Sequence, residues 1–148
     1  MKKLTLLLAL LVITVGNAQI LEPVKWTTSV KKISDKEYEL IATASIEPNW
    51  HLYSQTVPEN GPIPTTFSFA SSPNFLKKGN TKEDAGHTIN DPVFDMVIKF
   101  FETQASFKQR ILIKKQAPFK VEATVEFMVC DDSRCLPPTE VDLVFNIK

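Results

Sequence analysis

The sequence of 148 residues has few glycines, only two cysteines and no excess of either charge. Four glycines beside ten phenylalanines favour a well-filled interior over a disordered or linker-rich chain. The 17 basic and 17 acidic residues provide no basic excess that would attract nucleic acid or an anionic membrane. We therefore predict a single compact domain that does not bind nucleic acid.

Only one long apolar run is present, Leu4–Val15, and it is shorter than the roughly 20 residues needed to span a bilayer. Two lysines precede it, and small residues follow it up to Ala18, as in a secretory signal peptide. We predict cleavage after Ala18, which leaves a mature domain of residues 19–148 with a net charge of about −2. The mature chain begins with Gln19 rather than cysteine, so we expect a periplasmic protein without a lipid anchor or stable membrane insertion.

Helical periodicity is absent from the mature chain, where alternation of apolar and polar residues with period two dominates. About seven strands are predicted: Trp26–Val30, Glu37–Ile46, Thr65–Phe69, Val97–Phe101, Phe107–Ile113, Lys120–Val129 and Val141–Ile147. Short strands without crossover helices predict an all-β fold, an immunoglobulin-like antiparallel β-sandwich. Six aromatic residues are expected to pack between its sheets: Trp26, Phe67, Phe69, Phe100, Phe127 and Phe145.

Two long stretches without alternation, Pro48–Pro64 and Ser71–Asp95, interrupt the predicted strands. Irregular loops of this length in a compact domain are usually functional or disordered. Both stretches carry aromatic residues, which favours a functional role.

The two cysteines, Cys130 and Cys135, lie between the last two predicted strands, where they bracket the tip of a hairpin close to solvent. In exported proteins such a pair most often forms a structural bridge. A ring of roughly six residues, however, contributes only about 2 kcal/mol of stability. An exposed, short bridge is better suited to exchange, in which an attacking thiolate must reach a sulfur in line.

Charged residues adjoin the cysteines and influence their reactivity. Asp131 and Asp132 disfavour a thiolate at Cys130, whereas Arg134 opposes this effect. We expect a raised thiol pKa and a cysteine that reacts mainly when a docked partner changes its surroundings. The alternative is that these acidic residues only solvate a turn.

Two histidines, His51 and His87, could join the cysteines in a zinc or copper site. The cysteine spacing is at the edge of the structural zinc pattern, and the histidines lie on separate loops. We therefore predict no metal site and no cofactor.

Three segments together resemble the N-terminal periplasmic domain of the thiol:disulfide interchange protein DsbD. They are Pro48–Ser54, Asp91–Phe94, and Cys130–Cys135 followed by Leu-Pro-Pro. The resemblance covers essentially the whole mature chain. It implies an immunoglobulin-like fold with a redox-active cysteine pair that passes electrons between a thioredoxin-like domain and oxidised periplasmic proteins.

The resemblance also implies roles for individual residues. Cys130 and Cys135 would be the redox pair, with Cys130 forming the mixed disulfide with a partner. A cap loop would cover the disulfide, and an aromatic pair would lie beneath it. The cap residues are Phe94 and Asp91, and the aromatic pair is Tyr53 and His51.

Full-length members of that family continue into a membrane-spanning domain and a thioredoxin-like domain, whereas this chain ends at Lys148. We therefore expect a stand-alone version that receives electrons from a separate thioredoxin-like protein. The predicted function is periplasmic thiol:disulfide interchange, as a component of a protein-disulfide reductase system. The alternative is a non-catalytic secreted binding or adhesion module with a structural disulfide.

Overall fold

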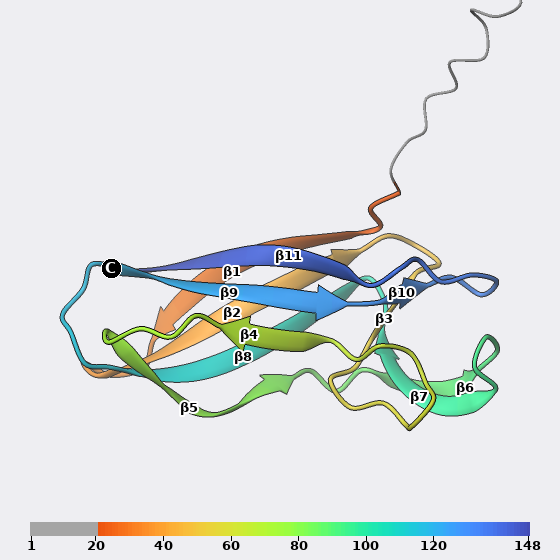
Figure 1. Cartoon of the computed structure of the whole chain (residues 1–148), viewed down its shortest axis with the longest axis horizontal. Helices are drawn as coiled ribbons and strands as arrows, with labels where there is room; N and C mark the ends of the chain where they lie inside the picture. The colour runs from red at the N-terminus through yellow and green to blue at the C-terminus, as the bar shows by residue number, and fades with distance from the viewer. Residues whose placement is uncertain (1–20) are drawn as a thin grey trace, which may run out of the picture.

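The computed structural model describes residues 21–148, which form eleven β-strands in three antiparallel sheets (Figure 1). The predicted signal peptide, residues 1–18, lies outside this described part. Within residues 21–148 there is no helix that could cross a membrane. The predicted all-β antiparallel sandwich is confirmed.

Two of the sheets face each other and form the sandwich (Figure 1). The larger sheet has the order β1-β2-β8-β5, and the smaller has the order β11-β9-β4. Their strands are β1 (Val24–Lys32), β2 (Glu37–Ile46), β8 (Gln104–Ile113), β5 (Phe75–Glu83), β11 (Thr139–Ile147), β9 (Phe119–Phe127) and β4 (Thr66–Phe69). Strand β2 has the predicted bounds because its side chains alternate between the core and the outer face.

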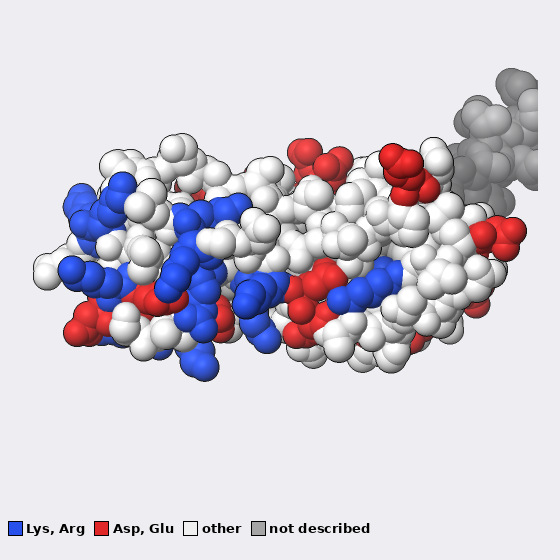
Figure 2. Space-filling model, turned by 90° about the horizontal axis from the view of Figure 1, so that it is seen from below, with Lys and Arg blue, Asp and Glu red and all other residues white. Residues whose placement is uncertain are grey.

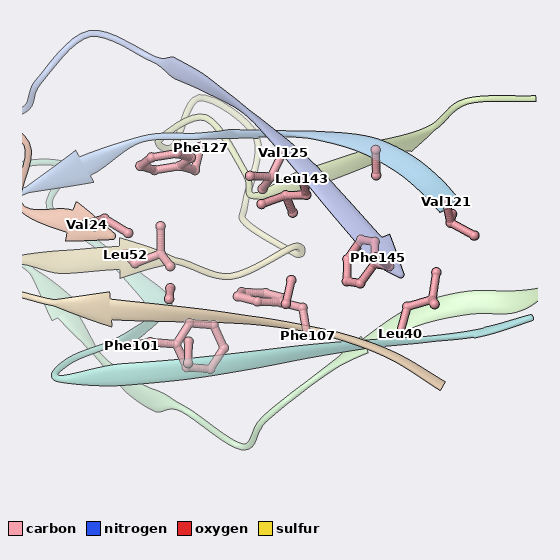
Figure 3. Close-up of a cluster of buried hydrophobic side chains, with 14 of the residues drawn as sticks. Val24, Leu40, Leu52, Phe101, Phe107, Val121, Val125, Phe127, Leu143 and Phe145 are labelled. Atoms are coloured by element: carbon pink, nitrogen blue, oxygen red, sulfur yellow. The ribbon is translucent and has the colours of Figure 1, made fainter. Parts of the chain in front are cut away.

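The core lies between these two sheets, and Figure 3 shows side chains from both of them meeting there. The ring of Trp26 lies 5.9 Å from Phe67, 5.7 Å from Phe107 and 5.5 Å from Phe127 between centroids. Each large apolar side chain buried in this way stabilises the fold by about 1.5–3 kcal/mol. Five of the six predicted core aromatics belong to this cluster or pack against it: Trp26, Phe67, Phe69, Phe127 and Phe145.

A third sheet extends from one end of the sandwich, at the right of Figure 1, in the order β10-β3-β7-β6. Its strands are β10 (Val129–Cys130), β3 (His51–Tyr53), β7 (Met96–Phe101) and β6 (His87–Asp91). Phe100 lies here, in a second buried cluster with Cys130, and not between the two main sheets as expected. The reason is that neighbouring residues of a strand face opposite sides, so Phe101 enters the main core while Phe100 enters the second cluster.

The prediction of two long irregular stretches was wrong in part. Strand β3 lies inside Pro48–Pro64, and strands β5 and β6 lie inside Ser71–Asp95. Strand β5 forms the edge of its sheet and pairs only with β8, so most of its residues are exposed and polar. An edge strand rich in lysine lacks the alternation from which strands are predicted, and its lysines discourage pairing with other chains.

The chain changes sheet at Met128, so the strand predicted over Lys120–Val129 is divided in two. Strand β9 pairs with β11, whereas β10 pairs with β3 and aligns Cys130 with His51. This change of partner carries the first cysteine into the third sheet, beside the segments from Pro48–Pro64 and Ser71–Asp95.

Candidate functional site

The disulfide between Cys130 and Cys135 closes a short hairpin, which we call the Cys hairpin (residues 130–135). The backbone N–H of Asp131 donates to the carbonyl of Arg134 at 2.9 Å, and that of Leu136 donates to the carbonyl of Val129 at 2.9 Å. The disulfide therefore links the two arms of a hairpin that backbone hydrogen bonds already hold together.

Asp131 shapes the turn of the Cys hairpin. Its Oδ1 accepts hydrogen bonds from the backbone N–H groups of Ser133 (2.9 Å) and Arg134 (2.8 Å) and from the Ser133 hydroxyl (2.9 Å). These bonds, first among them the one from the Ser133 backbone, lower the pKa of the Asp131 carboxyl from 3.8 to about 2. Asp131 is thus an ionised turn anchor, whereas Asp132 is exposed to solvent.

Arg134 ties the hairpin to the body of the domain. Its Nε lies 3.1 Å from Asp131 Oδ2, and its guanidinium carbon lies 5.8 Å from the ring centroid of the buried Trp50. Cation–π contacts of this kind favour arginine over the face of tryptophan. The sequence did not assign Trp50 to this contact.

The two cysteines differ in exposure. Cys130 is only 1% exposed, whereas Cys135 is partly exposed. The expectation that the pair lies close to solvent therefore holds for Cys135 alone, because β10 draws Cys130 into the third sheet beside His51.

Cys130 lies in an apolar cluster with three other buried residues, Tyr53, Ile98 and Phe100. Five partly buried residues pack against this cluster: Val57, Phe94, Met96, Met128 and Cys135. Apolar surroundings disfavour a thiolate. The expectation that Cys130 reacts mainly when a docked partner changes its surroundings stays a prediction.

A second turn, residues 91–96, which we call the cap turn, connects β6 to β7 and is held by Asp91. The Asp91 side chain is 1% exposed, and its Oδ1 accepts hydrogen bonds from the backbone N–H groups of Val93 (2.8 Å) and Phe94 (3.2 Å). Its Oδ2 accepts a hydrogen bond from the Tyr53 hydroxyl at 2.9 Å. Burial, assisted by this bond, raises the pKa of Tyr53, so the phenol stays neutral and remains a donor.

Phe94 of the cap turn lies edge-on to Tyr53, with 5.9 Å between ring centroids and an interplanar angle of 89°. Its side chain is partly buried against the cluster that contains Cys130. Five of the predicted site residues are therefore brought together: Phe94, Asp91, Tyr53, Cys130 and Cys135.

Both histidine rings pack beside Phe100. Together with the cysteines they do not form a set of metal ligands within residues 21–148. Ring centroids are 4.4 Å apart for His51 and Phe100 and 6.2 Å apart for His87 and Phe100. His51 Nε2 also lies 3.2 Å from Glu102 Oε1. In residues 21–148 no group of three or more histidine, cysteine, aspartate or glutamate side chains is arranged to hold a metal ion.

The sequence matches one protein family, described as the N-terminal part of the thiol:disulfide interchange protein DsbD, over residues 17–145. No curated protein sequence matches the chain. The match covers the Cys hairpin, the cap turn and all three sheets except the last two residues of β11.

Two solved structures resemble the chain in fold. One is the N-terminal domain of DsbD from Neisseria meningitidis in the reduced form, with a TM-score of 0.53 and 14% identity over 89% of this chain and 92% of that chain. The other is the N-terminal periplasmic domain of ScsB from Proteus mirabilis, with a TM-score of 0.56 and 13% identity over 82% of this chain and 44% of that chain. These likenesses confirm the immunoglobulin-like sandwich.

The contact between Phe94 and the cluster around Cys130 leads to a prediction about access to the disulfide. Phe94→Ala should speed reduction by dithiothreitol about threefold or more, because the ring no longer excludes a small thiol. Stability should fall by about 1–2 kcal/mol, less than the roughly 3–5 kcal/mol of a fully buried phenylalanine. The matched control is Val93→Ala on the same turn, since Val93 is 40% exposed and should leave the rate unchanged. An unchanged rate in Phe94→Ala would show that the ring does not limit access.

The hydrogen bonds to Asp131 predict a dependence of the Cys hairpin on pH. The folded-state pKa of about 2 lies below the unfolded value of 3.8, so the stabilising contribution of Asp131 is present above about pH 4 and is lost as the pH falls through about 2. The chemical shift of the Ser133 amide proton should report this titration, and Asp131→Asn should abolish it. A midpoint near 3.8 would contradict the proposed turn.

Proposed function

The chain belongs to the family of the N-terminal domain of the thiol:disulfide interchange protein DsbD, and from this premise we propose that it carries electrons in the periplasm. Its Cys130–Cys135 bond opens to a dithiol and closes again. The proposed donor is a thioredoxin-like protein or domain, and the acceptors are oxidised periplasmic thiol proteins. The chain then acts as one component of a protein-disulfide reductase system.

The observation that carries this proposal is the position of the disulfide in a short hairpin, with one cysteine partly exposed and the other covered. A bridge between residues five positions apart constrains little of the unfolded chain and contributes only about 2 kcal/mol. Such a bond is opened and closed at a small cost in stability, as a carrier requires.

Electron transfer proceeds in two exchange steps. A thiolate of the reduced donor attacks Sγ of Cys135, which forms a mixed disulfide and releases Cys130 as the thiolate leaving group. The second thiolate of the donor then attacks its own sulfur in the mixed disulfide and releases Cys135. Two electrons have moved from donor to chain, the donor has become a disulfide, and protons from solvent complete the two thiols. The same steps in reverse reduce an oxidised acceptor.

Exposure favours Cys135 as the attacked sulfur, because Cys130 is 1% exposed and lies inside the apolar cluster. This is the reverse of the assignment made from the sequence, in which Cys130 faces the partner. Burial of Cys130 also suits it as the cysteine that re-forms the bridge, because its sulfur is shielded from other oxidants.

The cap turn supplies selectivity between small thiols and proteins. Phe94 packs against the cluster beside the disulfide, and two side chains of the cap turn, Asp91 and Phe94, contact Tyr53. A docking protein can displace the turn and gain contact area in return, whereas a small thiol gains none. Displacement on docking is a gating role of the kind that mobile loops perform in enzymes.

Export is supported by one comparison and by one prediction from the sequence. The related structure from Proteus mirabilis is a periplasmic domain, and the sequence begins with the predicted signal peptide of residues 1–18. An oxidising compartment is also where a disulfide persists between turnovers.

A second candidate is a secreted binding or adhesion module in which the bridge is structural, and the burial of Cys130 is the observation that favours it. The two functions predict different responses to reduction. The carrier keeps its fold as a dithiol, whereas the structural bridge does not.

Reduction with dithiothreitol should therefore open the bond and leave the sandwich folded. The free energy of unfolding should fall by about 2 kcal/mol, out of roughly 5–15 kcal/mol for a typical domain. Alkylation followed by mass spectrometry should then find two added groups, while circular dichroism keeps the strand signal. Loss of the fold on reduction would support the structural bridge and exclude the carrier.

Trapping experiments identify the attacked sulfur. The probe is a thioredoxin-like protein whose second active-site cysteine is replaced by serine and whose remaining cysteine carries a thionitrobenzoate leaving group. Cys130→Ser retains the partly exposed Cys135 and should form the mixed disulfide at least about tenfold faster than Cys135→Ser, because burial of Cys130 limits attack.

Equal rates for the two variants in denaturant provide the control, since both cysteines are then exposed. Faster trapping by Cys135→Ser in the folded state would restore Cys130 as the cysteine that faces the partner.

A further inference from the structure

The charges of the chain are segregated between the two ends of the long axis. The three segments that build the redox end, residues 47–64, 87–102 and 128–137, contain seven acidic and only two basic residues. The two basic residues, Lys99 and Arg134, are already paired with Glu83 and Asp131. The redox end is therefore strongly acidic.

The opposite end is basic. We define the basic end as residues 31–37, 74–78, 112–120 and Lys148. Backbone hydrogen bonds join three of these segments, from Ile113 N–H to the Lys36 carbonyl at 2.9 Å and from Lys114 N–H to the Asn74 carbonyl at 2.7 Å. The C-terminal end of β11 lies beside the start of β9 through the pair Ile147 and Phe119. Figure 2 shows Lys and Arg concentrated toward this end, at the left, while charged groups at the right are mostly Asp and Glu.

The basic end contains nine lysines and only two acidic residues. Both acidic residues are engaged in ion pairs, Asp35 with Lys32 at 2.9 Å and Glu37 with Lys78 at 3.1 Å. Several exposed lysines of this end make no ion pair within residues 21–148: Lys31, Lys36, Lys77, Lys114, Lys115, Lys120 and Lys148. Their charge is available to an anionic partner.

Exposed aliphatic side chains accompany these lysines. Leu76 is 50% exposed, Ile33 is 38% exposed and Leu112 is 36% exposed. Leu76 and Leu112 are direct cross-strand neighbours on β5 and β8, so their side chains form one apolar spot on the outer face of the sheet. Ile33 lies in the turn between β1 and β2, among Lys31, Lys32 and Lys36.

We infer that the basic end binds the surface of an anionic phospholipid bilayer, with the redox end directed away from it. Peripheral binding of this kind combines lysine contacts to anionic headgroups with burial of exposed apolar side chains in the headgroup layer. A soluble polyanion such as nucleic acid accounts for the lysines but not for the aliphatic residues. Within residues 21–148 the large apolar side chains that are exposed include no aromatic ring on which a base would stack.

The acidic end fixes the orientation. An anionic bilayer attracts the basic end and repels the acidic end, so the long axis of the sandwich stands away from the surface. The Cys hairpin and the cap turn then point toward partner proteins. The net charge of about −2 expected for residues 19–148 does not reveal this property, because it sums over two ends of opposite sign.

Sedimentation with lipid vesicles tests the inference on the protein purified after export. At low salt the protein should bind vesicles that contain phosphatidylglycerol and should not bind vesicles of phosphatidylcholine alone. The double variant Lys114→Gln/Lys115→Gln should bind about tenfold more weakly or worse. The matched control Lys25→Gln/Lys82→Gln removes the same charge at exposed positions outside the basic end and should bind within about threefold of wild type.

Two further measurements separate the possible partners and orientations. Leu76→Ser should weaken binding to vesicles but not to dextran sulfate, because only the bilayer buries the aliphatic side chain. Dithiothreitol should reduce the disulfide of vesicle-bound protein as fast as that of free protein.

Three results would overturn the inference. The first is no binding to anionic vesicles, or equal loss of binding in the two double variants. The second is that Leu76→Ser weakens binding to vesicles and binding to dextran sulfate equally, or that the protein binds dextran sulfate but not vesicles. The third is reduction that slows several-fold on vesicles, which would place the redox end against the membrane.

Discussion

The redox end depends on one buried hydrogen bond, from the Tyr53 hydroxyl to the Asp91 carboxylate at 2.9 Å. Tyr53 is fully buried beside Cys130, and Asp91 organises the cap turn that carries Phe94. This bond therefore connects the buried cluster around Cys130 to the cap turn. Burial keeps the phenol protonated, which preserves the donor that the buried carboxylate needs. A buried carboxylate oxygen without that donor would be costly, so the bond stabilises the cap turn in its observed position.

A turn held by an aspartate side chain occurs twice at this end of the molecule. Asp91 holds the cap turn, and Asp131 holds the Cys hairpin, each through a carboxylate oxygen that accepts backbone N–H groups two and three residues later. Aspartate is well suited to such turns because its short side chain bonds the following backbone. The two turns are short and are anchored separately, the cap turn by Asp91 and the Cys hairpin by Asp131.

Strands whose side chains alternate between core and solvent could be predicted from the sequence, and β2 has the predicted bounds because both its faces follow that rule. Strand β5 could not, since an edge strand buries few side chains and shows no alternation. The site residues Tyr53, Asp91 and Phe94 came from the resemblance to a family. The burial of Cys130 could not be predicted, because it depends on the change of sheet at Met128, which leaves no pattern in the sequence. The segregation of charge between the two ends likewise depends on which distant turns the fold brings together.

The reduction potential of the Cys130–Cys135 pair tests the central claim most directly. It is measured by equilibrating the protein with defined ratios of oxidised and reduced dithiothreitol or glutathione and by quantifying alkylated thiols. A carrier exchanges electrons with thioredoxin-like proteins, so the account predicts a potential within their range, from about −270 mV to about −120 mV. A potential below about −300 mV, typical of structural disulfides in secreted proteins, would contradict it.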